Sequence, residues 1–194
     1  MTNAQAAGKL VVISGPSGVG KSTICRRIVE KRDAFLSVSA TTRKPGASEE
    51  NGRDYWFVSR QEFERRIRAG EFLEYADVFG NYYGTPRPPV EKALAEGRTV
   101  ILEIDVQGGL QVRQKCPEAV LIFILPPRPE DLQQRMRCRG RGEDEASRKR
   151  RLETAEKEIA AARKHYDYFV VNADLDAAIQ EVMDIIDGIC KGNI

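Results

Sequence analysis

The feature that most constrains the fold is a glycine-rich turn between an apolar run and a helical stretch. Residues 10–13 (LVVI) form an unbroken apolar run, which predicts a buried strand. Residues 15–22 (GPSGVGKS) follow and match G-x-x-x-x-G-K-[ST] at every specified position. A helix is predicted from about Ser22 to Arg32. This succession predicts an α/β fold whose first turn binds phosphate groups, and an accidental glycine-rich turn is disfavoured in that setting.

The chemistry of the turn explains its residues. Its glycines let the backbone curl so that successive N–H groups point at phosphate oxygens, next to the positive end of the following helix. Lys21 is expected to bridge the β- and γ-phosphates, and the Ser22 hydroxyl to bind Mg²⁺. We therefore assign ATP binding to Gly15, Pro16, Ser17, Gly18, Val19, Gly20, Lys21 and Ser22.

The rest of the chain continues the alternation of strands and helices, with one interruption. Apolar runs at 99–105 (TVILEID), 120–125 and 168–171 are predicted strands, with helical patterns near 129–139, 143–166 and from 174. This favours a parallel sheet covered by helices on both faces. Residues 36–90 break the rhythm, so we expect an inserted mixed α/β lobe. The expected single domain has a core at about 9–35, 98–127 and 165–190, that lobe, and a lid at about 128–152.

Composition excludes several classes of protein. The formal net charge of +2 over 194 residues is too small for a general nucleic-acid binder. No apolar stretch reaches the ~20 residues of a membrane span, and residues 1–8 lack the pattern of a signal peptide. We therefore expect a cytoplasmic protein. The four cysteines and the single His165 lack the spacing of a zinc site, and reduced thiols are expected.

Several segments of the interrupted region carry a more specific pattern. They are Ser39–Arg43 (SATTR), Asn51–Tyr55 (NGRDY), Glu74 and residues 80–85 (GNYYGT), followed by residues 101–108 (ILEIDVQG). In this order, and together with the phosphate turn, the set resembles the guanylate kinase family from about Lys9 to Ile186. The resemblance implies a P-loop α/β fold, transfer of the γ-phosphoryl group of ATP to GMP, and a requirement for Mg²⁺.

The resemblance also implies an acceptor site in the lobe. Arg43, Tyr55 and Tyr83 would hold the GMP phosphate, through a forked guanidinium and phenolic hydroxyls. Glu74 would accept hydrogen bonds from guanine N1–H and the 2-amino group, a donor pair that adenine lacks. The family implies further contacts from Ser39, Thr85 and Asp105, the last of which would steady Mg²⁺ through water and orient the acceptor-site arginine. Each residue alone has an ordinary structural explanation, and the combination favours the site.

One position departs from the family pattern. Relatives carry a second arginine three residues after the first, and this chain has Gly46 there. One phosphate contact is therefore absent, and Lys44 or Arg53 is a candidate substitute as a point charge. We predict weaker GMP binding than in a protein with both arginines.

The segment 128–151 is rich in arginine, as phosphoryl transfer requires of a closing lid. The resemblance places lid arginines at Arg135, at Arg139 or Arg141, and at Arg151. It also places Asn172 near the adenine of ATP. An RNA-binding arginine patch is disfavoured because aromatic residues are absent from this segment and acidic residues dilute it.

Two other functional classes stay open at this stage. One is a non-catalytic module of the same fold that binds phosphorylated peptides. The phosphate turn and the lid arginines argue against it. The other is a P-loop kinase with a different acceptor, such as a phosphorylated sugar, which Glu74 and residues 83–85 disfavour. The expected partners are therefore ATP and GMP, without nucleic acid or membrane, and a homo-oligomer is left open.

Overall fold

The computed structural model describes residues 8–78, 80–128, 130–131 and 145–188, and the side chains within this range except those of 145–152. Its core is a five-stranded sheet in the order β2-β7-β1-β8-β9. All neighbouring strands are parallel. This confirms the predicted parallel sheet, and the carboxyl ends of its strands share one edge. The strands are β1 (Leu10–Ser14), β2 (Ala34–Leu36), β7 (Thr99–Glu103), β8 (Val120–Leu125) and β9 (Tyr168–Val171).

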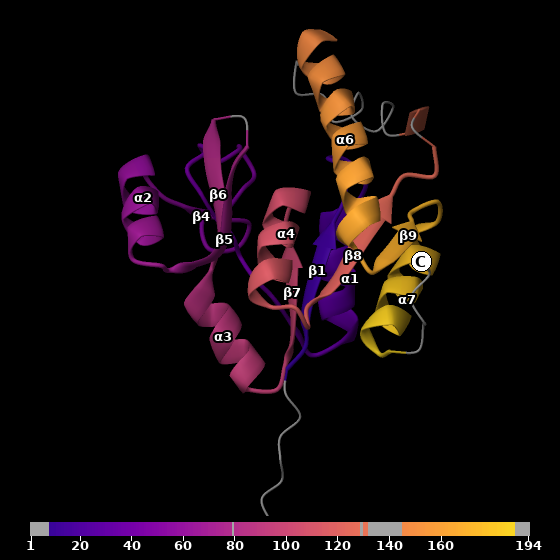
Figure 1. Cartoon of the computed structure of the whole chain (residues 1–194), viewed down its shortest axis with the longest axis horizontal. Helices are drawn as coiled ribbons and strands as arrows, with labels where there is room; N and C mark the ends of the chain where they lie inside the picture. The colour runs from indigo at the N-terminus through magenta and orange to yellow at the C-terminus, as the bar shows by residue number, and fades with distance from the viewer. Residues whose placement is uncertain (1–7, 79, 129, 132–144, 189–194) are drawn as a thin grey trace, which may run out of the picture.

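Helices cover both faces of this sheet (Figure 1). Because side chains alternate along a strand, Val11 and Ile13 pack toward α1 (Lys21–Lys31) and α7 (Leu175–Ile186). Leu10 and Val12 face the other way, toward three helices. These are α3 (Arg87–Ala95), α4 (Val106–Lys115) and α6 (Glu145–His165). Within the part of the chain that the structure describes, no helix has the length and apolar character needed to cross a membrane.

A second sheet lies to one side of the core, beyond α4 (Figure 1). Its order is β4-β3-β6-β5, and the β5–β6 pair is an antiparallel hairpin. Phe63 of the adjoining helix packs with Ala40 and Phe72, giving this lobe its own small core. The Ser59 side chain caps that helix by accepting from the Glu62 N–H. The elements are β3 (Ala40–Thr41), β4 (Trp56–Phe57), α2 (Arg60–Arg68), β5 (Phe72–Val78) and β6 (Asn81–Pro86).

Several boundaries differ from the sequence prediction. The alternation of apolar residues over 35–40 predicts one strand, and the structure has two short strands there that belong to different sheets, β2 and β3. The strand expected at 99–105 ends at Glu103, and Asp105 instead caps α4, which was not predicted. Gly108 and Gly109 lower the helix propensity of that segment, and its packing against β5 and α6 overrides this. The predicted helix at 129–139 lies almost entirely outside the described residues.

Candidate active site

The phosphate turn connects β1 to α1 at the carboxyl edge of the core sheet. Gly20 caps α1 in a left-handed conformation with a φ of 106°, which side chains rarely allow. Gly15 passes so close to β8 that a Cβ there would lie 2.5 Å from the carbonyl oxygen of Ile124. Only glycine fits at these two positions. They allow the tight curl of the turn, in which backbone N–H groups can point at a bound phosphate.

Lys21 and Ser22 begin α1 and lie on this turn. The Lys21 Nζ donates to the carbonyl oxygens of Gly15 at 2.5 Å and Pro16 at 3.2 Å. Burial lowers the pKa of Lys21, while Glu103 is the largest of the nearby charges that oppose this shift. The Ser22 Oγ donates a 2.6 Å hydrogen bond to Oε1 of Glu103, at the end of β7. The ammonium group is therefore held over the turn, beside a carboxylate that can balance its charge.

Asn172 supports the turn from the end of β9. Its Nδ2 donates a buried 2.7 Å hydrogen bond to the Val19 carbonyl oxygen. A Cβ on Gly20 would lie 2.6 Å from the same nitrogen. The structure thus places this predicted ATP-site residue against the backbone of the phosphate turn.

A second polar cluster, in the lobe, contains three predicted phosphate-binding residues. Arg43 follows β3, and its Nε donates to the Tyr83 hydroxyl at 3.1 Å. The guanidinium carbon lies 5.4 Å from the centre of the Tyr55 ring. The rings of Tyr55 and Tyr83 meet edge to face at 5.9 Å. Burial raises the pKa of Tyr55 to about 12, so a neutral phenol lies beside the forked cation of Arg43.

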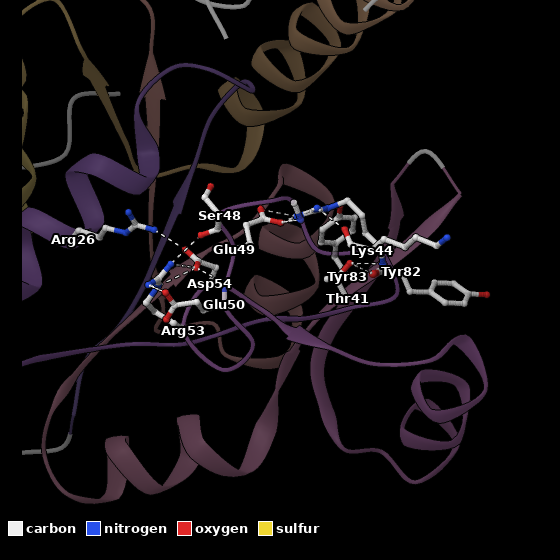
Figure 2. A network of polar contacts seen from close by, with 12 residues as sticks. Arg26, Thr41, Lys44, Ser48, Glu49, Glu50, Arg53, Asp54, Tyr82 and Tyr83 are labelled. Carbon is white, nitrogen blue, oxygen red and sulfur yellow. Dashed lines mark hydrogen bonds and ion pairs between the residues drawn. The ribbon is translucent and has the colours of Figure 1, made fainter. Parts of the chain in front are cut away.

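Arg43 has a partner in this cluster that no sequence motif indicates. The Nη1 and Nη2 groups of Arg43 donate to the two carboxylate oxygens of Glu49 at 2.9 and 2.8 Å. One of those oxygens also accepts from the Gly46 N–H at 2.6 Å. A carboxylate six residues away gives no periodic signal in a loop, so only the structure reveals this bidentate pair. Glu49 lies in the loop between β3 and β4, and its side chain points toward the side of Lys44 and Tyr83 (Figure 2).

Arg53, a candidate substitute for the absent second arginine, belongs to a different network. It pairs with Glu50 and Asp54 and donates to the Ser48 carbonyl oxygen. Asp54 also accepts from Arg26 of α1 at 3.0 Å, linking the lobe to the core (Figure 2). Arg53 therefore serves the loop and its contact with α1, while Lys44 has an exposed side chain next to Arg43.

Glu74 and Thr85 face each other across the β5–β6 hairpin. The Thr85 hydroxyl donates a buried 2.6 Å hydrogen bond to Oε1 of Glu74. Only 3% of Glu74 is exposed, and burial raises the pKa of its carboxyl to about 7. Tyr83 lies two residues before Thr85 on β6 and so on the same face. Ser39 immediately precedes β3, and its carbonyl oxygen accepts from the Trp56 N–H at 2.9 Å.

Asp105 lies near both Lys21 of the phosphate turn and Glu74 of the lobe. Its Oδ1 accepts from the Gly108 N–H at 2.8 Å, capping α4, and its charge raises the pKa values of Glu74 and Glu158. Its carbonyl oxygen accepts from Ser14 at 3.3 Å. The Tyr166 hydroxyl, just past α6, donates to the same Ser14 at 2.7 Å. Hydrogen bonds thus join the phosphate turn, α4 and the end of α6.

The predicted lid residues are described only in part. Arg135, Arg139 and Arg141 lie outside the described residues, and Arg151 lies on α6 with a side chain that is also outside them. Farther along α6, Glu158 is mostly buried, and this burial raises its pKa to about 7 while Lys21 opposes the shift. The helix that follows the predicted lid therefore returns to the phosphate turn.

The oxygen atoms of Ser22 and Glu103 are the best candidates to hold Mg²⁺. Hard cations of this size prefer oxygen ligands and are held by few protein groups, together with substrate phosphates and water. Within the described residues, no three histidine, cysteine or acidic side chains converge as a metal cluster. The pair at 2.6 Å beside Lys21 fits a metal that phosphates and water coordinate in large part.

The parallel sheet, its phosphate turn and the polar site in the adjoining lobe define a P-loop phosphotransferase. A family model described as guanylate kinase matches residues 7–188. The chain therefore belongs to the guanylate kinase family.

Relatives and solved structures agree with this membership. A guanylate kinase of Clostridium perfringens is 51% identical over 180 residues, covering 92% of this chain and 82% of the relative. One from Synechocystis is 48% identical, covering 92% and 93%. The crystal structure of guanylate kinase from Anaplasma phagocytophilum has a TM-score of 0.80 at 34% identity, covering 95% of this chain and 87% of that one. A gluconokinase structure from Sinorhizobium meliloti, at 18% identity and a TM-score of 0.52, shares the fold alone.

Proposed function

We propose that this protein transfers the γ-phosphoryl group of ATP to GMP and releases ADP and GDP. The observation that carries the proposal is the buried Glu74 carboxylate, hydrogen-bonded to Thr85 in the same lobe as the Arg43–Tyr83 pair. One part of the lobe suits a purine edge that donates two hydrogen bonds, and another suits a phosphate. Family membership supports the same reaction.

The phosphate turn would hold ATP, and the Arg43 cluster would hold the acceptor phosphate. The backbone N–H groups of the turn at 15–22, to which Pro16 cannot contribute, and the Lys21 ammonium would bind the triphosphate. Arg43, Tyr55 and Tyr83 bind the phosphate of GMP and orient its attacking oxygen in line with the γ-phosphorus. This division assigns phosphoryl transfer to positioning and charge, without a nucleophilic side chain.

Residues beyond the two clusters complete the proposed site. Arg135, Arg139 and Arg151 would bring positive charge to the moving phosphoryl group as the lid closes. Asn172 would act at the ATP site, and Ser39 and Thr85 at the base. The proposed division of labour is a core at about 9–35, 98–127 and 165–190, an acceptor lobe at 36–90 and a lid at 128–152.

The reaction would use Mg²⁺ bound with ATP. Ser22 and Glu103 would hold the ion, and Asp105 would act through water. When bound, the ion neutralises charge on the β- and γ-phosphates. Protein residues would bind and orient ATP: the turn would hold the triphosphate, and Lys21 would face the transferred group.

The setting that we propose is cytoplasmic, where ATP and GMP are both available. The proposed partners are these two small molecules, with no nucleic acid and no membrane. Whether the enzyme forms a homo-oligomer does not enter the proposed chemistry.

A coupled assay that follows ATP consumption tests the proposal. With Mg²⁺ and GMP, the protein should consume ATP and produce equal amounts of ADP and GDP. Binding of GMP without any turnover would favour the phosphopeptide-module class. Turnover with a phosphorylated sugar, and none with GMP, would favour a different acceptor.

A further inference from the structure

The carboxylate of Glu74 rests against the first turn of α4. Gly108 lies in that turn, is buried, and donates its N–H to the capping carboxylate of Asp105. A Cβ on Gly108 would lie 2.5 Å from Oε2 of Glu74 and 3.0 Å from its Cδ. Real Cβ atoms do not approach other atoms so closely, so the second oxygen of Glu74 occupies the space that any side chain at 108 would take.

The two oxygens of this carboxylate therefore have different neighbours. Oε1 accepts from Thr85 on β6, and Oε2 lies against Gly108 on α4. The hairpin and the helix thus fix the carboxylate plane from two sides. The N-terminal end of α4 also carries partial positive charge, which favours the ionised form that burial disfavours.

We infer that Gly108 is a specificity-determining position for the acceptor base. The inference rests on the proposed function, in which Glu74 accepts from guanine N1–H and the 2-amino group. A methyl group at 108 would push the carboxylate away from α4 and out of the plane in which it accepts both donors. The 2-amino contact distinguishes GMP from inosine 5′-monophosphate, so discrimination between these two acceptors reports the carboxylate position directly.

The neighbouring Gly109 provides a matched control. It lies in the same helix, and alanine there brings the same gain in helix propensity. A Cβ on Gly109, however, would meet the Tyr166 hydroxyl on the other side of α4. Gly109→Ala therefore alters the contact with the end of α6 and leaves the Glu74 carboxylate in place.

The first experiment compares kcat/KM for GMP and for inosine 5′-monophosphate in three proteins. Gly108→Ala should lower the ratio of the two values by about tenfold or more, a change of about 1.4 kcal/mol, with the KM for ATP within about twofold of wild type. Gly109→Ala should keep the wild-type ratio. An unchanged ratio in a folded Gly108→Ala, or an equal fall in Gly109→Ala, overturns the inference.

A thermal unfolding cycle tests the contact without catalysis. Gly108→Ala should lower the Tm of the wild-type protein, because the methyl group displaces a buried carboxylate. In a Glu74→Ala background the carboxylate is gone, and the nearest remaining neighbour of that methyl group is the flexible end of the Ile104 side chain, with Cδ1 at 3.3 Å. The same change should then leave the Tm equal or higher. An equal fall in both backgrounds overturns the inference. Absence of GMP turnover by the wild type would instead refute the proposed function.

Discussion

The Ser22 hydroxyl and the Glu103 carboxylate are joined by a 2.6 Å hydrogen bond between the first turn of α1 and the end of β7. The metal role predicted for Asp105, two residues farther along, is an indirect one through water that accompanies the Ser22 hydroxyl. One carboxylate oxygen of Asp105 caps α4. The two acids are therefore separable by mutation, although both lie near Lys21.

Glu103→Gln should raise the Mg²⁺ concentration that gives the half-maximal rate by about tenfold, because an amide oxygen is a weaker ligand than a carboxylate. Asp105→Asn should alter this requirement less, since asparagine also caps helices. Mg²⁺ titrations at saturating ATP and GMP measure both. A larger rise in the Mg²⁺ requirement for Asp105→Asn than for Glu103→Gln would contradict this prediction and indicate that Asp105 contributes more to Mg²⁺ binding.

Lys21→Ala should lower kcat by about 100-fold or more while leaving the circular dichroism spectrum intact. The ammonium of Lys21 donates to the backbone of the turn, so its loss removes positive charge that would stabilise the transferred group. Lys31→Ala, in the exposed last turn of α1, is the control and should keep normal turnover. Near-normal turnover of folded Lys21→Ala would rule out the proposed role of this side chain.

The absence of a second arginine in the acceptor loop should weaken GMP binding. Gly46→Arg is expected to lower the KM for GMP by about tenfold, because it adds a forked donor for the phosphate. A side chain at 46 begins 3.1 Å from Oε2 of Glu49, so it enters beside the Arg43–Glu49 pair. Gly46→Ala controls for the loss of glycine. A KM for Gly46→Arg that is no lower than for Gly46→Ala would contradict the prediction.

Sequence and structure agree best where the signal is local. The apolar run of β1 and the motif at 15–22 predicted the parallel core, because strand, turn and helix follow one another directly. The α4 helix was missed because Gly108 and Gly109 weaken its local pattern, and tertiary packing decides its conformation. The short strand β3 is defined by pairing with Tyr83 and Gly84 of β6, residues far along the chain, which periodicity does not encode.

In the candidate site, too, residues in local motifs were predicted, whereas contacts between distant residues were not. Lys21, Arg43 and Glu74 were predicted from motifs, and the structure brings Arg43 together with Tyr55 and Tyr83. The contacts of Glu103 with Ser22 and of Gly108 with Glu74 join residues far apart in the chain. Their geometry depends on how β7 and α4 pack, so no spacing in the sequence predicts them.

The buried Glu74 should make GMP binding depend on pH. Its pKa of about 7 exceeds the ordinary 4.5, and only the ionised form accepts both guanine donors. The KM for GMP should therefore rise by up to about tenfold per pH unit below 7 and level off above 8. In Glu74→Gln the part of this pH dependence that Glu74 causes should disappear. The parts caused by titration of the GMP phosphate and of Glu158 should persist in both proteins. Equal pH profiles would contradict the assignment.

The same raised pKa has a defined effect on stability. Between about pH 4.5 and 7, folded Glu74 holds a proton that the unfolded chain has released. The contribution of Glu74 to the free energy of unfolding should thus fall as pH rises through this window. Chemical denaturation of wild type and Glu74→Gln at pH 5 and pH 8 measures it. A difference in stability between the two proteins that is independent of pH would contradict the burial argument.

The most direct test of the account compares GMP, AMP, CMP and UMP as phosphoryl acceptors, with ATP and Mg²⁺, in wild type and in Glu74→Gln. The wild type should turn over GMP strongly and the other three poorly. Glu74→Gln should lose at least about 100-fold in kcat/KM for GMP, with its KM for ATP largely retained. Equal use of several acceptors by the wild type, or full GMP selectivity in Glu74→Gln, would contradict the central claim that this carboxylate selects guanine.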